Sequence, residues 1–97
     1  MTTPRKKVAT FVRNLAGFTG HAALYRLTPP LERHAHVVVS ATVAMFSGPE
    51  TYIFAANAKG KVTKWGELPG SYRSGLDHAK ALRGAGYEVH YKKARGA

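Results

Sequence analysis

The sequence predicts a small α+β domain in which an antiparallel sheet of four or five strands packs against one helix. Three observations lead to this prediction. The chain has 97 residues, of which 44% are hydrophobic, and this suits a single domain over residues 1–97. Short stretches with alternating apolar and polar residues are separated by glycine and proline. One stretch near the C-terminus has helical spacing instead, so the predicted order is β-β-β-β-α-β.

The first two strands are expected before residue 30. Residues 8–15 fit either a helix face or a strand, and we favour a strand because glycines bracket a turn into the next one. The second strand covers residues 22–27. It is predicted to end at Pro29 and Pro30, because proline has no backbone donor for a sheet. A loop over residues 31–35 follows.

The clearest strand pattern covers residues 36–46. Its odd-numbered positions are apolar, and the alternation predicts that one face of this strand is buried. A turn signal over residues 47–50 precedes an aromatic-rich strand over residues 51–55, which makes the pair a hairpin. The residues expected on the buried face are Val37, Val39, Ala41, Val43 and Met45.

A second turn is predicted over residues 57–60, because Asn and Gly tolerate the positive φ that tight turns need. A short strand over residues 61–64 follows it. Trp65 and Leu68 come next, within a stretch rich in glycine and proline. We expect these two side chains to cover one end of the core.

The helix is predicted to open at Ser74, whose side chain can accept a hydrogen bond from the backbone of Asp77 in a variant of the capping box. Gly84 and Gly86 are expected to end it. Residues 87–91 alternate again and form the last predicted strand. The apolar face of the helix is expected to carry Leu76, Ala79, Leu82 and Ala85.

The net charge is the most unusual property of the chain. Lys and Arg total 15 against 5 Asp and Glu, so the formal charge is +10. A protein with this charge attracts polyanions such as nucleic acid or an acidic protein. Nine of the 15 basic residues fall in an N-terminal arm (residues 1–7), at a hairpin tip and in a C-terminal tail (residues 92–97). The candidate phosphate-binding residues are Arg5, Lys6, Lys7, Lys59, Lys61, Lys64, Lys92, Lys93 and Arg95.

Charged ends of this kind have two interpretations. Arms and tails are typical places for phosphate contacts, which need charge but little geometry. They are equally typical of solvated ends without a function. The aromatic residues in the second half of the chain also have two interpretations, because they either stack on unpaired bases or form the core. We favour the core for this group, which comprises Tyr52, Phe54, Trp65, Tyr72, Tyr87 and Tyr91.

The residue types argue against several kinds of chemistry. The sequence has no cysteine, which excludes a disulfide scaffold, a thiol enzyme and a cysteine-ligated zinc site. His34 and His36 would share one face of a strand, but two ligands do not make a metal site. Asp77 and His78 are adjacent, and adjacent helical residues do not face each other. No glycine-rich loop precedes the helix. We therefore expect no catalytic residue, metal or cofactor.

Location and assembly are also constrained. No stretch approaches the ~20 apolar residues that span a bilayer, and no apolar segment follows the basic N-terminus as in a secretory signal. We expect a cytoplasmic protein without a membrane partner. The strand over residues 51–55 is apolar on both faces, which leaves room for a homo-oligomer.

Several segments of the sequence resemble segments of a group of short proteins encoded by actinobacteriophages. They are HAALYRL at residues 21–27, SGPETYIF at residues 47–54, WGELPGSY at residues 65–72 and the stretch over residues 77–87. The resemblance spans residues 11–89 and implies an accessory protein of a phage that infects mycobacteria and their relatives. It carries over no catalytic residue.

Charge and resemblance together predict a small non-enzymatic protein that acts by binding in the infected bacterial host. The first expectation is nucleic-acid binding with little sequence preference. One alternative is a host-directed module that docks on an acidic bacterial protein, for example through an edge strand. Another is a minor component of the virion or of its assembly.

Overall fold

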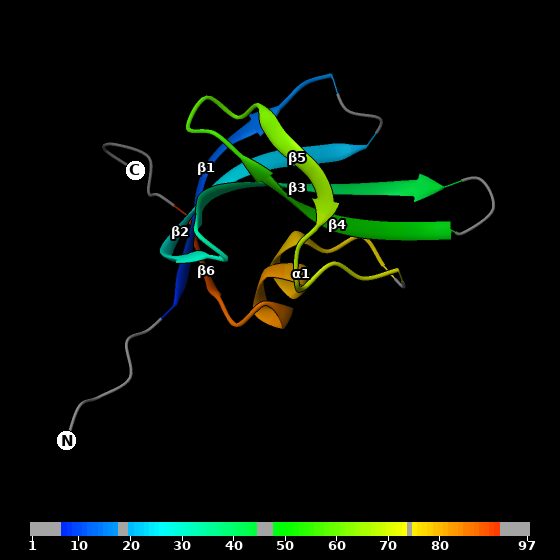
Figure 1. Cartoon of the computed structure of the whole chain (residues 1–97). Helices are drawn as coiled ribbons and strands as arrows, with labels where there is room; N and C mark the ends of the chain where they lie inside the picture. The colour runs from blue at the N-terminus through cyan, green and yellow to red at the C-terminus, as the bar shows by residue number, and fades with distance from the viewer. Residues whose placement is uncertain (1–6, 18–19, 45–47, 74, 92–97) are drawn as a thin grey trace, which may run out of the picture.

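Six strands and one helix make up the part of the chain that the structure, a computed structural model, describes: residues 7–17, 20–44, 48–73 and 75–91 (Figure 1). The α+β class is therefore confirmed, as is the strand interpretation of residues 8–15. The elements are β1 (Val8–Leu15), β2 (His21–Leu31), β3 (His34–Ala44), β4 (Gly48–Ala56), β5 (Val62–Glu67), α1 (His78–Gly84) and β6 (Glu88–Tyr91).

The strands form one sheet in the order β5-β4-β3-β2-β1-β6. Neighbours from β1 to β5 are antiparallel, whereas β6 lies parallel to β1. Two details of the prediction are therefore wrong. The sheet has six strands rather than four or five, with five before the helix, and it is mixed rather than wholly antiparallel. The cause is the connection through α1, which carries the chain from the β5 edge to the β1 edge, where β6 adds in the direction of β1.

The larger core lies between the sheet and α1. Leu68 is buried in it, as predicted, but the Trp65 side chain is 66% exposed and does not cover the core. Trp65 belongs to β5, so it extends from the sheet instead of folding over its end. The buried residues of this core are Ala9, Ala23, Tyr25, Leu27, Val37, Val39, Ile53, Ala55, Leu68, Ala81, Leu82 and Tyr87.

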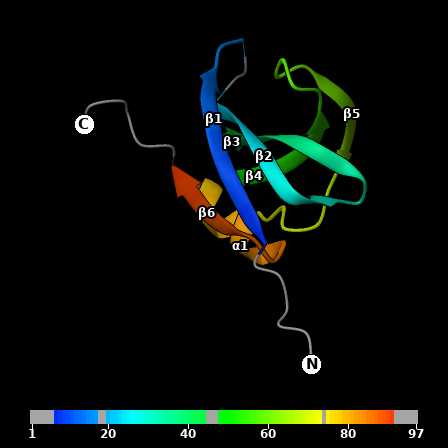
Figure 2. The ribbon, with the colours of Figure 1, turned by 90° about the vertical axis from the view of Figure 1, so that its left-hand side faces the viewer.

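The opposite face of the sheet has a second, smaller core. Ala22, Leu24 and Val38 are completely buried there. Leu15 of β1 and Val62 of β5 pack against them, although β1 and β5 are separated by three strands in the sheet. The sheet must therefore curl toward this face. Figure 2 shows the curl as an arc, with β1 and β5 at its two sides and α1 on the outside.

The strand β3 is buried in its first half only. Val37, Val39 and Ala41 are buried as predicted, but Val43 is 65% exposed, which corrects that part of the assignment. Met45 lies outside the described residues. The burial ends because the paired strands β3 and β4 extend beyond the layer formed by α1, as Figure 1 shows. A period-two pattern reports which side a residue faces, but not whether anything lies on that side.

The prolines of β2 do not end it. Pro29 and Pro30 lie inside the strand, at a place where the pairing register with β3 shifts. The predicted loop over residues 31–35 is correspondingly reduced to a tight turn, in which Glu32 and Arg33 have φ of 46° and 73°. Proline is tolerated in a sheet where the ladder of hydrogen bonds lapses.

The helix α1 begins later than predicted. Its N-cap is Asp77, whose side-chain oxygen accepts a hydrogen bond from the Lys80 backbone N–H at 3.1 Å. The assignment of Ser74 as the cap is wrong, since the helix starts at His78; Ser74 itself lies outside the described residues. Leu76 precedes the helix and is half-exposed, so the predicted apolar face is displaced. The buried helical residues are His78, Ala81 and Leu82.

Candidate nucleic-acid interface

The turn between β4 and β5 is held by one asparagine. The Asn57 side-chain oxygen accepts hydrogen bonds from the backbone N–H groups of Lys59 and Lys61 at 2.9 and 3.0 Å. The Gly60 N–H donates to the Asn57 carbonyl at 3.0 Å, and Gly60 has a φ of 90°, which glycine adopts without strain. The predicted turn over residues 57–60 is thus confirmed, and it gives both lysines a defined backbone position.

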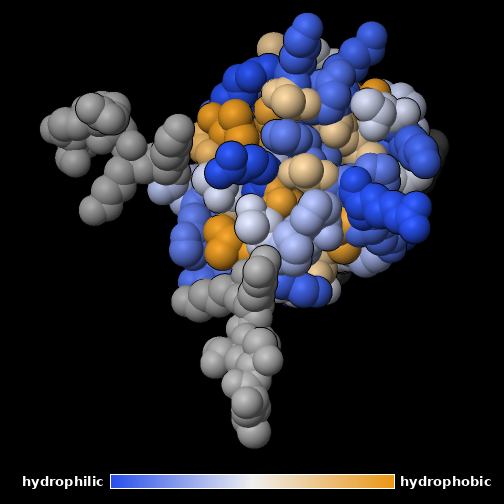
Figure 3. Space-filling view, turned by 60° about the vertical axis from the view of Figure 1, so that its left-hand side comes forward, coloured by the Kyte–Doolittle hydropathy of each residue, from blue (hydrophilic) through white to orange (hydrophobic). Residues whose placement is uncertain are grey.

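Arg13 of β1 reaches this turn from the other side of the curled sheet. Its guanidinium donates a hydrogen bond to the Lys59 carbonyl. Four exposed cationic residues therefore belong to one end of the molecule and to β5 beside it. We call them the basic patch: Arg13, Lys59, Lys61 and Lys64. In Figure 3 hydrophilic side chains project from the upper end of the molecule, where Figure 1 places the β4–β5 turn and the end of β1.

No carboxylate lies in the β4–β5 turn, although Glu67 belongs to β5. Asp77 caps α1, and Glu67 pairs with Arg73. Glu50 is buried beside Tyr52, where its hydrogen bond to the phenol raises the pKa of Tyr52. The other two acidic residues are at the β2–β3 turn and on β6. Among the described residues, none forms an ion pair with a lysine of the basic patch. The positive charge of the patch is therefore not neutralised within this part of the chain.

The remaining predicted phosphate-binding residues are not gathered at the patch. Lys7 is exposed just before β1, and its ammonium lies 5.8 Å from the centre of the Tyr87 ring. It is six positions from Arg13 along an extended strand, a separation of roughly 20 Å. The other predicted cations, Arg5, Lys6, Lys92, Lys93 and Arg95, lie outside the described residues. Sequence reasoning missed Arg13, because only the curl of the sheet brings β1 to the β4–β5 turn.

Three aromatic side chains lie in a row beside the patch. Tyr52 and Phe54 alternate on β4, so both project from the face opposite α1, with ring centres 5.8 Å apart. Trp65 of β5 meets Phe54 edge to face at 5.2 Å. We call this row the aromatic strip: Tyr52, Phe54 and Trp65. The first two rings are half-buried, whereas Trp65 is largely exposed.

An arginine lies against the far end of the strip. The guanidinium carbon of Arg73 is 5.3 Å from the centre of the Tyr52 ring. Glu67 forms an ion pair with the same guanidinium, at 2.5 Å between the nearest nitrogen and oxygen atoms. A planar cation on an aromatic face is a favourable arrangement, and the carboxylate restricts its orientation. The strip is therefore extended by a fourth planar group.

The prediction that the aromatic residues form the core applies only to part of the group. Tyr87 is buried, and Tyr72 is half-buried against the core. Tyr91 and Trp65 are 62% and 66% exposed. The exposed aromatic residues differ from the buried ones in their position in the sheet, because Tyr91 and Trp65 belong to the two edge strands β6 and β5.

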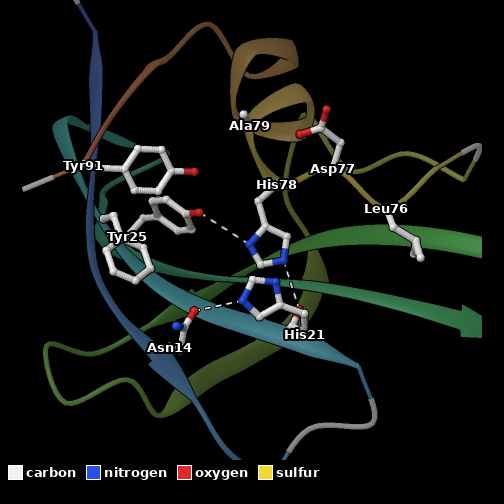
Figure 4. Close-up of a pocket in the computed structure, with 9 residues that line it drawn as sticks. Asn14, His21, Tyr25, Leu76, Asp77, His78, Ala79 and Tyr91 are labelled. Atoms are coloured by element: carbon white, nitrogen blue, oxygen red, sulfur yellow. Dashed lines mark hydrogen bonds between the residues drawn. The ribbon is translucent and has the colours of Figure 1, made fainter.

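A pocket of about 350 Å³ lies near the start of α1, on the opposite side of the sheet from the aromatic strip (Figure 4). The rings of His21 and His78 are stacked there, with centres 4.5 Å apart and planes inclined by 13°. The Nε2 of His21 lies 2.8 Å from the Asn14 side-chain oxygen. The Nε2 of His78 lies 3.0 Å from the His21 carbonyl, and its Nδ1 lies 3.4 Å from the Tyr25 hydroxyl.

These contacts fix the tautomer of the neutral His78 ring. A carbonyl can only accept, so Nε2 of His78 carries the proton and Nδ1 accepts from Tyr25. Burial lowers the pKa of His78, and the hydrogen bond to the His21 carbonyl opposes part of this shift. Burial also raises the pKa of Tyr25, helped by the neighbouring Tyr91. In Figure 4 the Asp77 carboxylate points away from the His78 ring. The arrangement ties β2 to α1 by hydrogen bonds.

Other site chemistries find no support in the described ranges. No group of three or more His, Asp and Glu side chains there is close enough to hold a metal ion, and this includes the surroundings of His34 and His36. In the same part of the chain, no helix has the length and apolar character to cross a membrane.

Comparison of the whole chain with known protein families, with curated proteins and with solved structures finds no match.

Proposed function

We propose that this protein acts by binding nucleic acid with little sequence preference, and that the basic patch contacts the phosphates. The observation that carries the proposal is the patch itself, four exposed cations with no carboxylate partner among the described residues. Contacts to phosphate need charge and reach but little fixed geometry. Such a patch therefore favours binding without base readout.

The role is binding rather than catalysis. The pocket near the start of α1 contains His78, whose two ring nitrogens are both engaged in hydrogen bonds to β2. A general base must present a free nitrogen to its substrate, so this arrangement favours a structural role for the residue. The resemblance to short actinobacteriophage proteins suggests the setting, an infected bacterial cell, and stays a prediction.

The test is the salt dependence of binding. Each phosphate neutralised on duplex DNA contributes about 0.9 to the slope of log affinity against log salt. The double substitution Lys61→Ala/Lys64→Ala should weaken binding and reduce this slope by up to about two units. The matched control is Lys80→Ala/Arg83→Ala, which removes the same charge from the exposed side of α1 and should leave the slope nearly unchanged.

Fluorescence anisotropy with labelled duplex DNA, measured over a series of salt concentrations, gives both slopes. Equal slopes for the two double variants would mean that the patch has no special part in binding. No binding at low ionic strength would reject a nucleic-acid partner. The next test would then be an acidic host protein, captured from a nuclease-treated lysate.

A further inference from the structure

The aromatic strip has the form of a surface on which flat groups stack. Its rings come from adjacent strands, with centres 5.8 Å and 5.2 Å apart, and Arg73 adds a planar cation 5.3 Å from Tyr52. Trp65 ends the strip on the side of β5 and is 66% exposed. A ring exposed to this extent offers surface on which a flat group can stack.

The charge beside the strip limits what such a partner can be. Lys64 directly precedes Trp65 in the edge strand β5 and pairs with Ala55, so its side chain leaves the other face of this edge, and Lys61 immediately precedes the same strand. Neither lysine has a carboxylate partner within the described ranges. A partner that covers the strip and also passes along the edge formed by β5 therefore combines flat apolar surfaces with closely spaced negative charges.

Nucleic acid has both properties, but only a single strand offers them together. In a duplex the faces of the bases are covered by their neighbours, so an aromatic side chain has no base to stack on without unstacking the helix. In a single strand every base has an accessible face, and stacking on protein aromatics tolerates any sequence.

We propose that the preferred ligand is a single-stranded nucleic acid, whose bases stack on the aromatic strip while Lys61 and Lys64 contact its phosphates. This inference rests on the proposed function and specifies its ligand. Trp65 provides the exposed stacking face. Arg73, held by Glu67, provides a second planar face at the other end of the strip.

The experiment compares one mixed-sequence oligonucleotide in two forms, as a single strand and annealed to its complement. The full-length protein should bind the single strand about tenfold more tightly, since stacking one base contributes about that factor. The chain contains a single tryptophan, so its intrinsic fluorescence reports on the strip directly. The single strand should quench this fluorescence, and the duplex should not.

Substitution of Trp65 tests the contact. Trp65→Ala should lose the preference for the single strand, a drop of about tenfold, while binding to the duplex and the salt slope stay unchanged. Trp65→Phe keeps a ring and should retain most of the preference. The matched control is Tyr91→Ala, which removes an equally exposed ring from β6 at the other edge of the sheet.

The possible results separate the two proposals. If single strand and duplex bind equally, without quenching, the inference is wrong while the proposed function stands. The inference also fails if Tyr91→Ala reduces the preference as much as Trp65→Ala does. Binding of neither form at low ionic strength would overturn the proposed function as well. Thermal unfolding of each variant shows whether it is folded, and Trp65→Phe tests the ring should the alanine variant be unstable.

Discussion

A single buried histidine connects the sheet to the helix. His78 is 8% exposed, donates to the His21 carbonyl and accepts from Tyr25. The groups around it are the phenol of Tyr25, the stacked ring of His21 and the more distant phenol of Tyr91, while the carboxylate of the adjacent Asp77 points away from the ring. A second proton on His78 would place a charge in a buried site, and the loss of hydration of that charge is the main reason for the lowered pKa.

The pH dependence of stability follows from this lowered pKa. In the unfolded chain His78 takes up a proton near the ordinary histidine pKa of 6.5, whereas the folded protein resists protonation until a lower pH. The unfolded state therefore binds more protons in this window, and stability falls as the pH drops below about 6.5. We expect the Tm to decrease between about pH 7.5 and pH 5, and His78→Gln to flatten that decrease.

Thermal unfolding across this pH range provides the measurement. His90→Gln is the control, because His90 is exposed on β6 and its removal should keep the steeper profile. If His78→Gln and the wild type have parallel profiles, the decrease on the acid side comes from another group.

Gly70 is a residue that the tertiary structure requires to be glycine. Its φ is 104°, and a Cβ at this position would lie 2.4 Å from the Ala81 carbonyl oxygen and 2.9 Å from Ile53 Cδ1. The loop thus passes directly over α1 with no room for a side chain. Gly70→Ala should destabilise the fold by about 2 kcal/mol or more, since both backbone strain and a steric clash oppose it.

Gly66 offers a matched comparison in β5. A Cβ there would meet no atom within 4 Å, and its φ is not positive. Gly66→Ala should change stability by at most about 0.5 kcal/mol. Chemical denaturation of the two variants measures the difference, and equal values would contradict the close approach of the loop to α1.

At the scale of the element, β3 shows that one alternating pattern can contain two environments. Val39 is completely buried between the sheet and α1, whereas Val43 on the same side of the strand is 65% exposed. The difference arises because α1 is short and covers only part of the sheet. The strand alternation is the same at both residues, so the neighbouring layer decides their burial.

The same pair provides a stability prediction. Val39→Asp places an unpaired carboxylate in the core and should destabilise the protein by about 4 kcal/mol or more, enough to unfold a small domain. Val43→Asp should leave the Tm within a few degrees of the wild type, because that position already faces solvent. Circular dichroism melting curves of the two variants test the boundary of the α1 layer. A folded Val39→Asp protein with an unchanged Tm would contradict it.

At the scale of the whole molecule, the charge of +10 is distributed over the described surface and both ends of the chain. The triple substitution Lys92→Ala/Lys93→Ala/Arg95→Ala should reduce the salt slope by up to about three units if all three contact phosphate. Its Tm should not change, because the three substituted side chains are all charged and are not expected to belong to a core. Weaker binding with an unchanged slope would assign the tail a role other than phosphate contact.

Much of the architecture follows from the sequence alone. Alternation and turn chemistry predict β1, the hairpin of β3 and β4, the turn at Asn57 and the last strand, because these depend on residues close together in the chain. The order of the strands in the sheet, the parallel β6 and the half-exposed β3 depend on which elements become neighbours. A local pattern contains no information about those neighbours.

The candidate interface also depends partly on the sequence alone and partly on the tertiary structure. The sequence by itself determines the net charge and the lysines of the β4–β5 hairpin, since these are properties of composition and of one tight turn. Only the tertiary structure decides that Arg13 joins them and that Trp65 and Phe54 meet in one strip beside Arg73. The physical reason is the curl of the sheet. Burial of the second core draws β5 toward β1, and the pairing of β5 with β4 at the edge of the sheet places Trp65 beside Phe54.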